Sequence, residues 1–355
     1  MENLNVKGNS YSLPIYLPDA TKAVVKGLSK QDLIDSNVDG VVVNTYHLAS
    51  KGLIKFGGIK NFMNFEGLVV SDSGGWQVFS LIHRRAGQGK ITDDGVIFEK
   101  GQKIFTPEDS IRAQFEIGSD IIICLDDFTS PTASNEEIKK SVDRTILWAE
   151  RCKSEFKKIV FEKNFTSETR PLLFSVIQGH FNKELRSYCA NELMKIGFDG
   201  YGFGGYPINL EGNLDLEISE YVANLIPEDA YKFALGVGRP WDIAQLYEFG
   251  WEIFDCTLPT RDARHNRLYV FKDSPDKNSD KLKSKDFYEY IYINKGLYEN
   301  DLSPISDFCE CPVCKNYSRA YIHHLNKIKD LAYLRLSAVH NLWTYNKVIE
   351  LLRNQ

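Results

Sequence analysis

Residues 251–264 read Trp-Glu-Ile-Phe-Asp-Cys-Thr-Leu-Pro-Thr-Arg-Asp-Ala-Arg, and this stretch is the most informative part of the chain. Within it, Asp255 follows a short apolar run and precedes a turn that contains Pro259, Arg261 and Arg264. An aspartate at the end of a strand is usually a turn or cap residue. Asp255 gains significance because several other apolar runs of the chain end in the same way.

Five further apolar runs lead directly into polar or glycine residues. The runs and the residues that follow them are 40–43 before Asn44, 67–70 before Ser71 and Asp72, 121–125 before Asp126, 172–177 before Gln178, and 201–203 before Gly204 and Gly205. Short, nearly continuous apolar runs are typical of strands that are buried on both faces of a parallel sheet. Because the carboxyl ends of parallel strands share one edge, we expect these polar side chains to gather there.

Amphipathic helical patterns lie between these runs. The clearest begins at Ser134, because Ser134 and Glu137 form a capping-box pattern ahead of apolar residues at helical spacing. Alternating strands and helices, with polar residues at the strand ends, predict a (β/α)8 TIM barrel whose active face is that end. A doubly wound sheet also binds ligands at the carboxyl ends of its strands, so it is the alternative fold. It fits less well, because a single crevice would not draw on so many successive strand ends.

The composition is that of an ordinary soluble domain, with 43% hydrophobic and 26% charged residues in a chain of 355. The first residues lack a basic segment followed by an apolar one, and no apolar run is long enough to cross a bilayer. We therefore expect a cytoplasmic protein. The net charge of −5 argues against a general nucleic-acid coat. It permits a local basic patch, formed by His83, Arg84, Arg85 and Lys90 or by Arg261, Arg264 and Arg267.

Three of the seven cysteines are packed into the segment Cys309-Glu310-Cys311-Pro312-Val313-Cys314. In a chain without a secretion signal, thiolates this close indicate a shared tetrahedral metal ion before they indicate disulfides. The fourth ligand must come from elsewhere in the chain. Three cysteines and one histidine leave no open coordination position, so we expect a structural zinc ion. The candidates for the fourth ligand are His323, His324 and His340.

The chain divides by composition into two parts. We expect a catalytic barrel over residues 1–272 and a zinc-binding helical subdomain over residues 273–355. The polar, charged segment 272–285 has the composition of a linker between them. The four cysteines outside the cluster are expected to be reduced and inert; they are Cys124, Cys152, Cys189 and Cys256.

Taken together and in order, the motifs of this chain resemble those of the tRNA-guanine transglycosylases over nearly the whole length. The matching motifs are Asn44-Thr45-Tyr46-His47-Leu48, Asp72-Ser73-Gly74-Gly75-Trp76-Gln77, Gly118-Ser119-Asp120 with Asp126, Gln178-Gly179, Gly204-Gly205, Gly236-Val237-Gly238, residues 254–261, the cysteine cluster, residues 318–322 and His340-Asn341. The resemblance implies a TIM barrel with a zinc subdomain. It also implies that His340 is the fourth zinc ligand.

The chemistry of that family breaks and remakes the bond between ribose C1′ and a base nitrogen without cutting the nucleic-acid chain. Two carboxylates can do this by the double displacement that retaining glycosidases use. Asp255 would attack C1′, and Asp72 would act as acid to the departing guanine and as base to the incoming one. Arg261 and Arg264 are candidates for RNA binding. The candidate substrate-binding residues are Asn44, Ser73, Trp76, Asp126, Gln178, Gly205 and Leu235.

Asp126 is a natural acceptor for the donors on N1 and the 2-amino group of guanine, and Gln178 with the N–H of Gly205 can donate to O6. The resemblance places Trp76 and Leu235 on the two faces of the base. A turn role for Gly205 and a core role for Trp76 are the plain alternatives.

The chain departs from the common bacterial pattern near the group on C7 of the base. Bacterial members carry Leu-small-Val-Gly-Glu after the paired glycines, whereas this chain has Tyr206-Pro207-Ile208-Asn209-Leu210. Phe128 replaces a common cysteine, and His265-Asn266 replaces Asn-Gly. The incoming base could therefore be queuine, 7-aminomethyl-7-deazaguanine or 7-cyano-7-deazaguanine.

Three functions remain open from the residues. They are exchange of guanine at the wobble position of a tRNA, the same exchange on DNA, and a catalytically silent partner subunit that binds RNA. Retention of both Asp72 and Asp255 argues against the third. The resemblance also implies a homodimer formed through Tyr317, Tyr321 and His324, with Lys26 at a second contact.

Overall fold

The computed structural model describes residues 1–50, 57–75, 89–97, 104–130, 132–205, 208, 212–275 and 282–355. Its centre is an eight-stranded sheet in which every neighbouring pair of strands is parallel. In order around the sheet, the strands are β3 (Ile15–Pro18), β12 (Ile253–Cys256), β11 (Tyr231–Ala234), β10 (Gly200–Phe203), β9 (Leu172–Ile177), β8 (Ile121–Ile123), β5 (Leu68–Asp72) and β4 (Gly40–Asn44).

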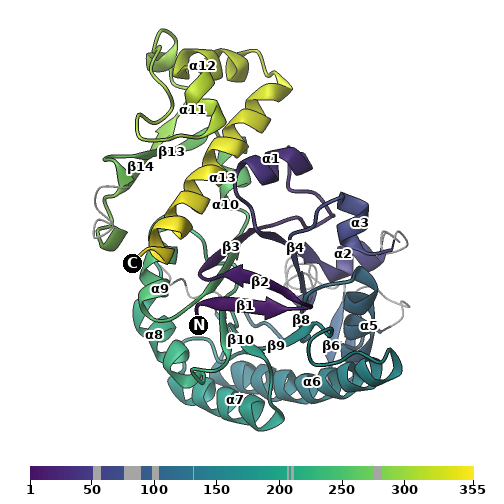
Figure 1. The fold of residues 1–355 in the computed structure, drawn as a ribbon. Coiled ribbons are helices and arrows are strands. Elements are labelled where there is room, and N and C mark those ends of the chain that lie inside the picture. Colours follow the sequence, from purple (N-terminus) through teal and green to yellow (C-terminus); the bar gives the residue numbers. More distant parts are fainter. Residues whose placement is uncertain are drawn as a thin grey trace.

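The two ends of this sheet meet, so the sheet closes into a barrel (Figure 1). A parallel bridge joins Asp19, just after β3, to Val42 of β4, and the N–H of Ala20 donates to the Val42 carbonyl at 2.7 Å. Helices connect most of the strands and lie around the outside of the barrel. The predicted (β/α)8 fold is confirmed, because a doubly wound sheet would stay open at both edges.

Helices between the strands surround the barrel, and the longest of them in the described residues begins where the sequence predicts. Around the barrel they are α1 (Lys30–Asp35), α2 (Thr45–Ser50), α3 (Ile59–Met63), α5 (Pro107–Ile117), α6 (Asn135–Glu162), α7 (Lys183–Ile196), α8 (Leu216–Leu225), α9 (Pro240–Glu248) and α10 (Leu258–Arg264). The capping box predicted at Ser134 and Glu137 is present at the start of α6. Apolar side chains of α6 at helical spacing face the barrel and are buried, among them Ile138, Val142 and Ala149.

The barrel interior is filled by side chains of alternate strand residues, such as Ile15, Val70 and Phe174. The amino-terminal hairpin of β1 (Asn3–Val6) and β2 (Asn9–Ser12) packs Leu4 and Val6 into the same cluster. Lys7 of this hairpin donates to the carbonyls of residues 118 and 119, which precede β8. The hairpin therefore covers the amino ends of the strands, and the carboxyl ends are left to form the site.

The carboxyl-terminal part contains a two-stranded antiparallel sheet and three helices. The elements are β13 (Arg267–Phe271), β14 (Tyr288–Tyr292), the 3-10 turn η4 (Gly296–Tyr298), α11 (Pro312–Asn316), α12 (Arg319–Lys327) and α13 (Leu331–Arg353). The predicted linker, residues 272–285, thus connects two paired strands. The division at residue 272 stays a prediction.

Helix α13 returns from this part to the barrel (Figure 1). Its Arg353 donates to the carbonyl of Pro14 at 2.9 Å, and its Arg335 pairs with Asp32 of α1 at 2.8 Å. Asn341 on the same helix donates to the carbonyl of Pro259 at 3.0 Å. The carboxyl-terminal part is therefore packed against the start of β3, against α1 and against α10, the helix that carries Arg261.

One further pair of strands, β6 (Lys90–Thr92) and β7 (Gly95–Ile97), forms a short antiparallel hairpin beside α6. Within the described ranges, no helix combines the length and the apolar composition that a membrane span requires.

Candidate active site

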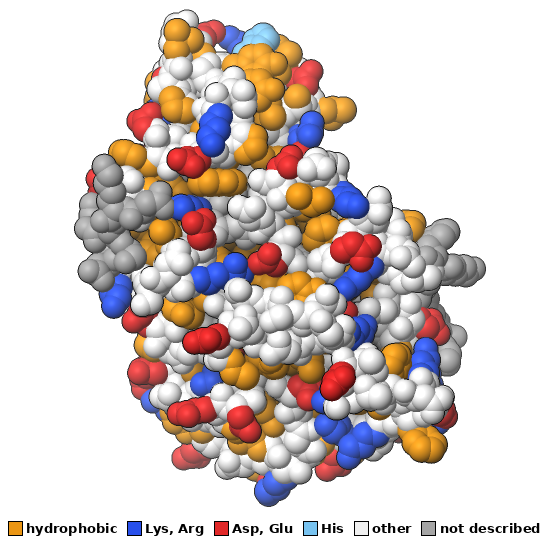
Figure 2. Space-filling view, in the orientation of Figure 1, with side chains coloured by type: hydrophobic (Ala, Val, Ile, Leu, Met, Phe, Trp, Pro, Cys, Tyr) orange, Lys and Arg blue, Asp and Glu red, His pale blue; other side chains and the backbone are white. Residues whose placement is uncertain are grey.

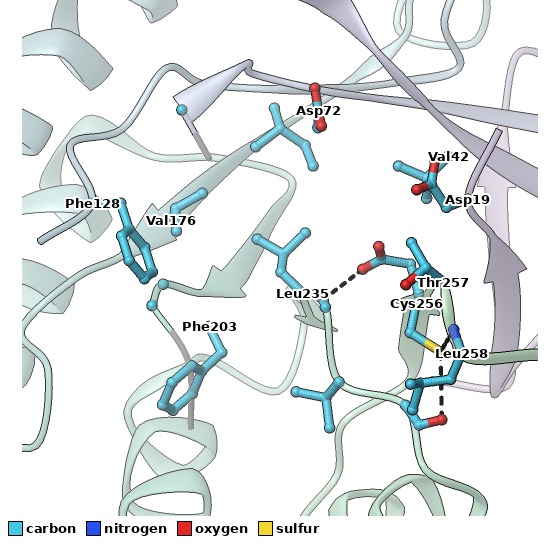
Figure 3. Close-up of a pocket in the computed structure, with 18 of the residues that line it drawn as sticks. Asp19, Val42, Asp72, Phe128, Val176, Phe203, Leu235, Cys256, Thr257 and Leu258 are labelled. Atoms are coloured by element: carbon cyan, nitrogen blue, oxygen red, sulfur yellow. Dashed lines mark hydrogen bonds between the residues drawn. The ribbon is translucent and has the colours of Figure 1, made fainter. Parts of the chain in front are cut away.

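The carboxyl ends of the barrel strands surround a cavity of about 880 Å³. Carboxylates from four different strand ends line it, namely Asp19, Asp72, Asp126 and Asp255. Figure 3 shows Asp19 at one end of the cavity and Phe128 at the opposite end, with Leu235 between them. The cavity therefore has carboxylates along its rim and aromatic side chains at the end opposite Asp19.

Asp255 is the third residue of β12, and its side chain faces this cavity. The N–H of Gly236 donates to its Oδ1 at 2.8 Å, and no other described residue donates to this carboxylate. Burial raises the pKa of Asp255 to about 7; the bond from Gly236 opposes this rise and the charge of Asp19 adds to it. One oxygen is thus fixed by the backbone, and the other is available to a ligand.

Asp72 is the last residue of β5, directly opposite Asn44 on β4. Asn44 donates to both carboxylate oxygens, at 2.7 and 3.0 Å, and the N–H groups of Thr45 and Gly74 donate to Oδ1 at 3.3 and 3.2 Å. Burial raises the pKa of Asp72 to about 7, and the hydrogen bonds limit that rise. A carboxyl group with a pKa of about 7 can both give and take a proton near neutral pH.

Asp126 follows β8 and is held by two side chains. Ser73 donates to its Oδ1 at 3.0 Å, and Gln178 donates to its Oδ2 at 2.7 Å. Burial raises the pKa of Asp126, and these two donors lower it. Gly75 is required here, because a Cβ at that position would lie 2.5 Å from Asp126 Oδ1. The three predicted base-binding residues Ser73, Asp126 and Gln178 are therefore brought together.

Gly205 and Leu235 also line the cavity, as the sequence predicts. Gly205 adopts a φ of +82°, which favours glycine, and a Cβ there would lie 3.7 Å from the ring of Phe128. Arg186 is buried beneath this region, with its guanidinium 4.2 Å from the centre of the Phe203 ring. This end of the cavity thus offers a backbone N–H beside apolar and aromatic surface.

The remaining predicted site residues do not all lie on the wall of the cavity. Asn44 is buried behind Asp72, and its amide is occupied by that carboxylate. Arg261 lines the cavity, whereas Arg264 lies one turn further along α10 and donates to Thr260 at 3.4 Å. Trp76 lies outside the described residues, as does the segment with Pro207.

Sequence reasoning missed Asp19, an acidic residue of the cavity that follows β3. The signal was present, because residues 15–17 form another apolar run and Pro18-Asp19 follow it. Arg239 and Asp242, which are paired at 2.7 Å, also line the cavity and were missed.

The predicted metal ligands Cys309, Cys311, Cys314 and His340 form one cluster, and their ligand atoms lie within 4.8 Å of one another. The three sulfur atoms lie 3.6, 3.5 and 3.4 Å from His340 Nδ1. A regular tetrahedron with zinc bond lengths places sulfur and nitrogen about 3.5 Å apart, so this donor set fits the ion. His340, not His323 or His324, is therefore the histidine of the cluster.

The second ring nitrogen of His340 lies 2.7 Å from the carbonyl oxygen of Tyr269. As a donor to that carbonyl, Nε2 would carry the ring proton and leave Nδ1 to face the thiolates. The hydroxyl of Tyr269 lies 3.1 Å from that of Tyr345, whose ring centre is 4.9 Å from that of Tyr16. Tyr16 donates to the carbonyl of Cys256 at 2.9 Å. A buried chain of contacts therefore connects the cysteine cluster to the residue after Asp255.

Comparison with known proteins agrees with this geometry. A family model described as queuine tRNA-ribosyltransferase matches residues 1–355. A protein of Methylacidiphilum infernorum named queuine tRNA-ribosyltransferase is 36% identical over 352 residues, which cover 96% of this chain and 87% of that protein.

Two further relatives carry the same name. One, from a Psychrobacter strain, is 34% identical over 349 residues, and another, from Caldanaerobacter subterraneus, is 35% identical over 348 residues. Each match covers 96% of this chain and 85% of the relative. The chain is therefore an enzyme of the queuine tRNA-ribosyltransferase family, a group of transglycosylases.

Proposed function

We propose that the enzyme exchanges guanine at the anticodon wobble position of a tRNA for a 7-deazaguanine base of the queuosine pathway. The observation that carries this proposal is the pair of buried carboxyl groups, Asp72 and Asp255, in one cavity with the guanine-matching group at Asp126. The names of the relatives support tRNA as the substrate.

In the first half of the reaction, a carboxylate oxygen of Asp255 forms a bond to ribose C1′ as the bond from C1′ to guanine breaks. Asp72 gives its proton to the departing base. In the second half, Asp72 takes a proton from the ring nitrogen of the incoming base as that nitrogen displaces Asp255 from C1′. The pKa of about 7 for Asp72 suits both directions of this proton transfer near neutral pH, and Asp255, with a similar pKa, is partly ionised there as a nucleophile requires.

Base recognition would use the cluster around Asp126. Its carboxylate can accept from N1–H and from the 2-amino group, while Gln178 and the N–H of Gly205 donate to O6. Gln178 is bound to Asp126 at 2.7 Å, so binding of the base would exchange that bond for bonds to the ligand. Leu235 lines the middle of the cavity and would contact one face of the base. Trp76 remains the predicted partner for the other face.

RNA binding would involve α10, since Arg261 lines the cavity and Arg264 follows on the same helix. Their positive charges would contact phosphates near the target nucleotide. The cysteine cluster would hold a zinc ion in a purely structural role, because all four positions of a tetrahedral ion would be occupied by protein. The zinc would contribute folding free energy to the carboxyl-terminal part.

A homodimer is part of this proposal. The stacked rings of Tyr317 and Tyr321 lie 5.3 Å apart, and both residues are exposed. Figure 2 shows hydrophobic side chains gathered on the part of the molecule that contains α11 and α12. Among the described residues, eight of the seventeen exposed large hydrophobic side chains lie between residues 292 and 331. An apolar surface of this kind is typical of an interface between subunits.

The experiment that tests the function uses labelled guanine and the purified protein with bulk tRNA or genomic DNA. We expect the label to enter tRNA and not DNA. We also expect Asp255→Asn to abolish this uptake and any denaturant-resistant adduct with an RNA stem-loop. Asp143→Asn, at an exposed position on α6, is the matched control and should retain exchange. Uptake by DNA, no uptake by either polymer, or full exchange in Asp255→Asn would overturn the proposal.

A further inference from the structure

Asp19 lies at the point where the barrel closes. It directly follows β3, whose Pro18 is opposite Cys256 of β12, and it forms the parallel bridge to Val42 of β4. Around the barrel, the order at this point is therefore β12 with Asp255, β3 with Asp19, then β4 and β5 with Asp72. Asp19 is thus the carboxylate between the two proposed reacting groups along the rim, and it faces the same cavity.

One oxygen of Asp19 is held by its own turn, and the other is not. The N–H and the hydroxyl of Thr21 both donate to Oδ1, at 2.6 and 2.5 Å. Within the described part of the chain, no donor to Oδ2 is present and no cation pairs with this side chain. The charge of Asp19 raises the pKa values of both Asp72 and Asp255, which agrees with its position between them. The turn fixes one oxygen, and the other is available to a ligand in the cavity.

The cavity separates the base from the sugar. Asp126, Gln178 and Gly205 follow β8, β9 and β10, which are neighbours on one side of the barrel. Asp255 lies near the end of β12, and Asp19 follows the adjacent strand β3, both on the other side. Figure 3 shows the same separation, with Asp19 and Thr257 at one end of the view and Phe128 at the other. If Asp255 contacts C1′, then Asp19 lies beside the ribose and not beside the base.

An internal ribose of RNA has few groups that can donate a hydrogen bond to a carboxylate. Its 3′ and 5′ oxygens are esterified to phosphate, and the phosphates are negative and repel an ionised Asp. The one donor on the sugar is the 2′-hydroxyl, which DNA lacks. A carboxylate oxygen that accepts from this hydroxyl would form a charge-assisted hydrogen bond in a partly desolvated site.

We propose that Asp19 is a specificity-determining residue that accepts a hydrogen bond from the 2′-hydroxyl of the target nucleotide and so selects ribose over deoxyribose. This inference rests on the proposed base exchange. It assigns to Asp19 a contact with substrate, beyond its role in the turn with Thr21.

The test is a cycle of one protein change and one substrate change. Base exchange is measured on an RNA stem-loop and on the same stem-loop with 2′-deoxyguanosine at the target position, for the unmodified enzyme and for Asp19→Ala. Intrinsic effects of the deoxy sugar on the glycosidic bond cancel when the two enzymes are compared. Asp229→Ala, which removes an exposed acidic residue before β11, is the matched control.

We expect the ratio of kcat/KM for the ribose substrate to that for the deoxyribose substrate to fall by about ten- to a hundredfold in Asp19→Ala. The ratio should stay unchanged in Asp229→Ala. Inhibition by free guanine should be the same in all three proteins, because the base end of the cavity is untouched. That measurement also verifies that the Asp19 variant is folded.

An equal loss of activity on both substrates in Asp19→Ala would overturn the inference and would leave Asp19 with a purely structural or electrostatic role. A shift of the pH–rate profile without a change in the ratio would overturn it as well. Absence of exchange by the unmodified enzyme on the ribose stem-loop would instead contradict the proposed function. The two failures are therefore distinguishable.

Discussion

The side-chain amide of Asn44 donates to both carboxylate oxygens of Asp72, at 2.7 and 3.0 Å. Donors to a carboxylate favour its ionised form, so these bonds hold the pKa of Asp72 below the value that burial alone would produce. Asn44 therefore helps to set the pH at which Asp72 loses its proton.

Replacement of Asn44 by Leu should move the pH–rate profile in one direction. Loss of the two bonds raises the pKa of Asp72, so its acid form persists to higher pH. The alkaline limb of the pH profile of kcat/KM for the RNA therefore moves to higher pH. The measurement is guanine exchange between about pH 5 and 9, with free-enzyme pKa values taken from the limbs. An alkaline limb that stays in place or moves to lower pH would contradict the acid role of Asp72.

Asp255, the proposed nucleophile, should lower the stability of the folded protein to an extent that depends on pH. The pKa of Asp255 is raised from 3.8 to about 7, so the folded state holds this proton more tightly than the unfolded state. The associated stability is present below the unfolded pKa and is lost as the pH rises toward 7. The neutral amide in Asp255→Asn avoids that loss, and its Oδ1 can still accept from Gly236.

We therefore expect Asp255→Asn to be inactive yet more stable than the unmodified protein, by about 1–3 kcal/mol at about pH 8, since each pKa unit is worth about 1.4 kcal/mol and solvent in the cavity screens part of it. The gain should shrink as the pH falls toward about 4. Urea unfolding at several pH values measures it. If the variant is less stable at high pH, or if its gain in stability does not depend on pH, then the ionised form of Asp255 does not destabilise the folded protein.

Removal of a cluster ligand should reduce both zinc content and stability. Cys311 and His340 are fully buried, and His340 also contacts the carbonyl of Tyr269. Cys311→Ser or His340→Ala should lower the metal found by elemental analysis and destabilise the carboxyl-terminal part. His324→Ala, at an exposed position on α12, should bind metal normally. Well-folded unmodified protein without zinc would refute the structural metal.

The proposed interface can be broken at one ring. Tyr321 is 44% exposed and stacks on Tyr317. Tyr321→Lys would place a charge in the apolar contact, so light scattering at micromolar concentration should report a single chain of 40.6 kDa, whereas the unmodified protein should report twice that mass. Phe161→Lys, at a still more exposed ring on α6, should stay dimeric. Unmodified protein that is monomeric would exclude the homodimer.

The barrel and most of its rim were predictable because the signal is local. Each buried parallel strand is a short apolar run, and the residue after it faces the active end whatever the other strands do. Asp72, Asp126 and Asp255 were found in this way. Asp19 was missed because Pro18-Asp19 resembles an ordinary turn, and only closure of the barrel brings it between β12 and β4.

Two other features depended on long-range contacts. From the residues alone, three histidines could complete the cysteine cluster, and the packing of α13 selects His340. Residues 272–285 have the composition of a linker, yet they connect β13 and β14, which pair with each other. The composition of a connecting segment carries no information about whether the strands on either side of it pair. Composition predicts that a segment is polar, and it does not predict what lies on either side of it in space.

Base choice is the prediction that depends most on departures from the bacterial pattern. The Glu that supports recognition of an aminomethyl group is absent, and Phe128 lies at the end of the cavity beside Gly205. Loss of a charge-assisted hydrogen bond costs about 1.5–3 kcal/mol, or about ten- to a hundredfold in discrimination.

We therefore expect normal exchange of guanine but weak preference for 7-aminomethyl-7-deazaguanine, with queuine or the 7-cyano base competing at least as well. Displacement of labelled guanine from an RNA stem-loop by each base in turn measures the order. Phe128→Cys restores the small residue common in bacterial members and should improve the aminomethyl base relative to the other two, while leaving guanine exchange intact. A clear preference of the unmodified enzyme for the aminomethyl base would contradict this prediction, because it would require a recognising group other than the missing Glu.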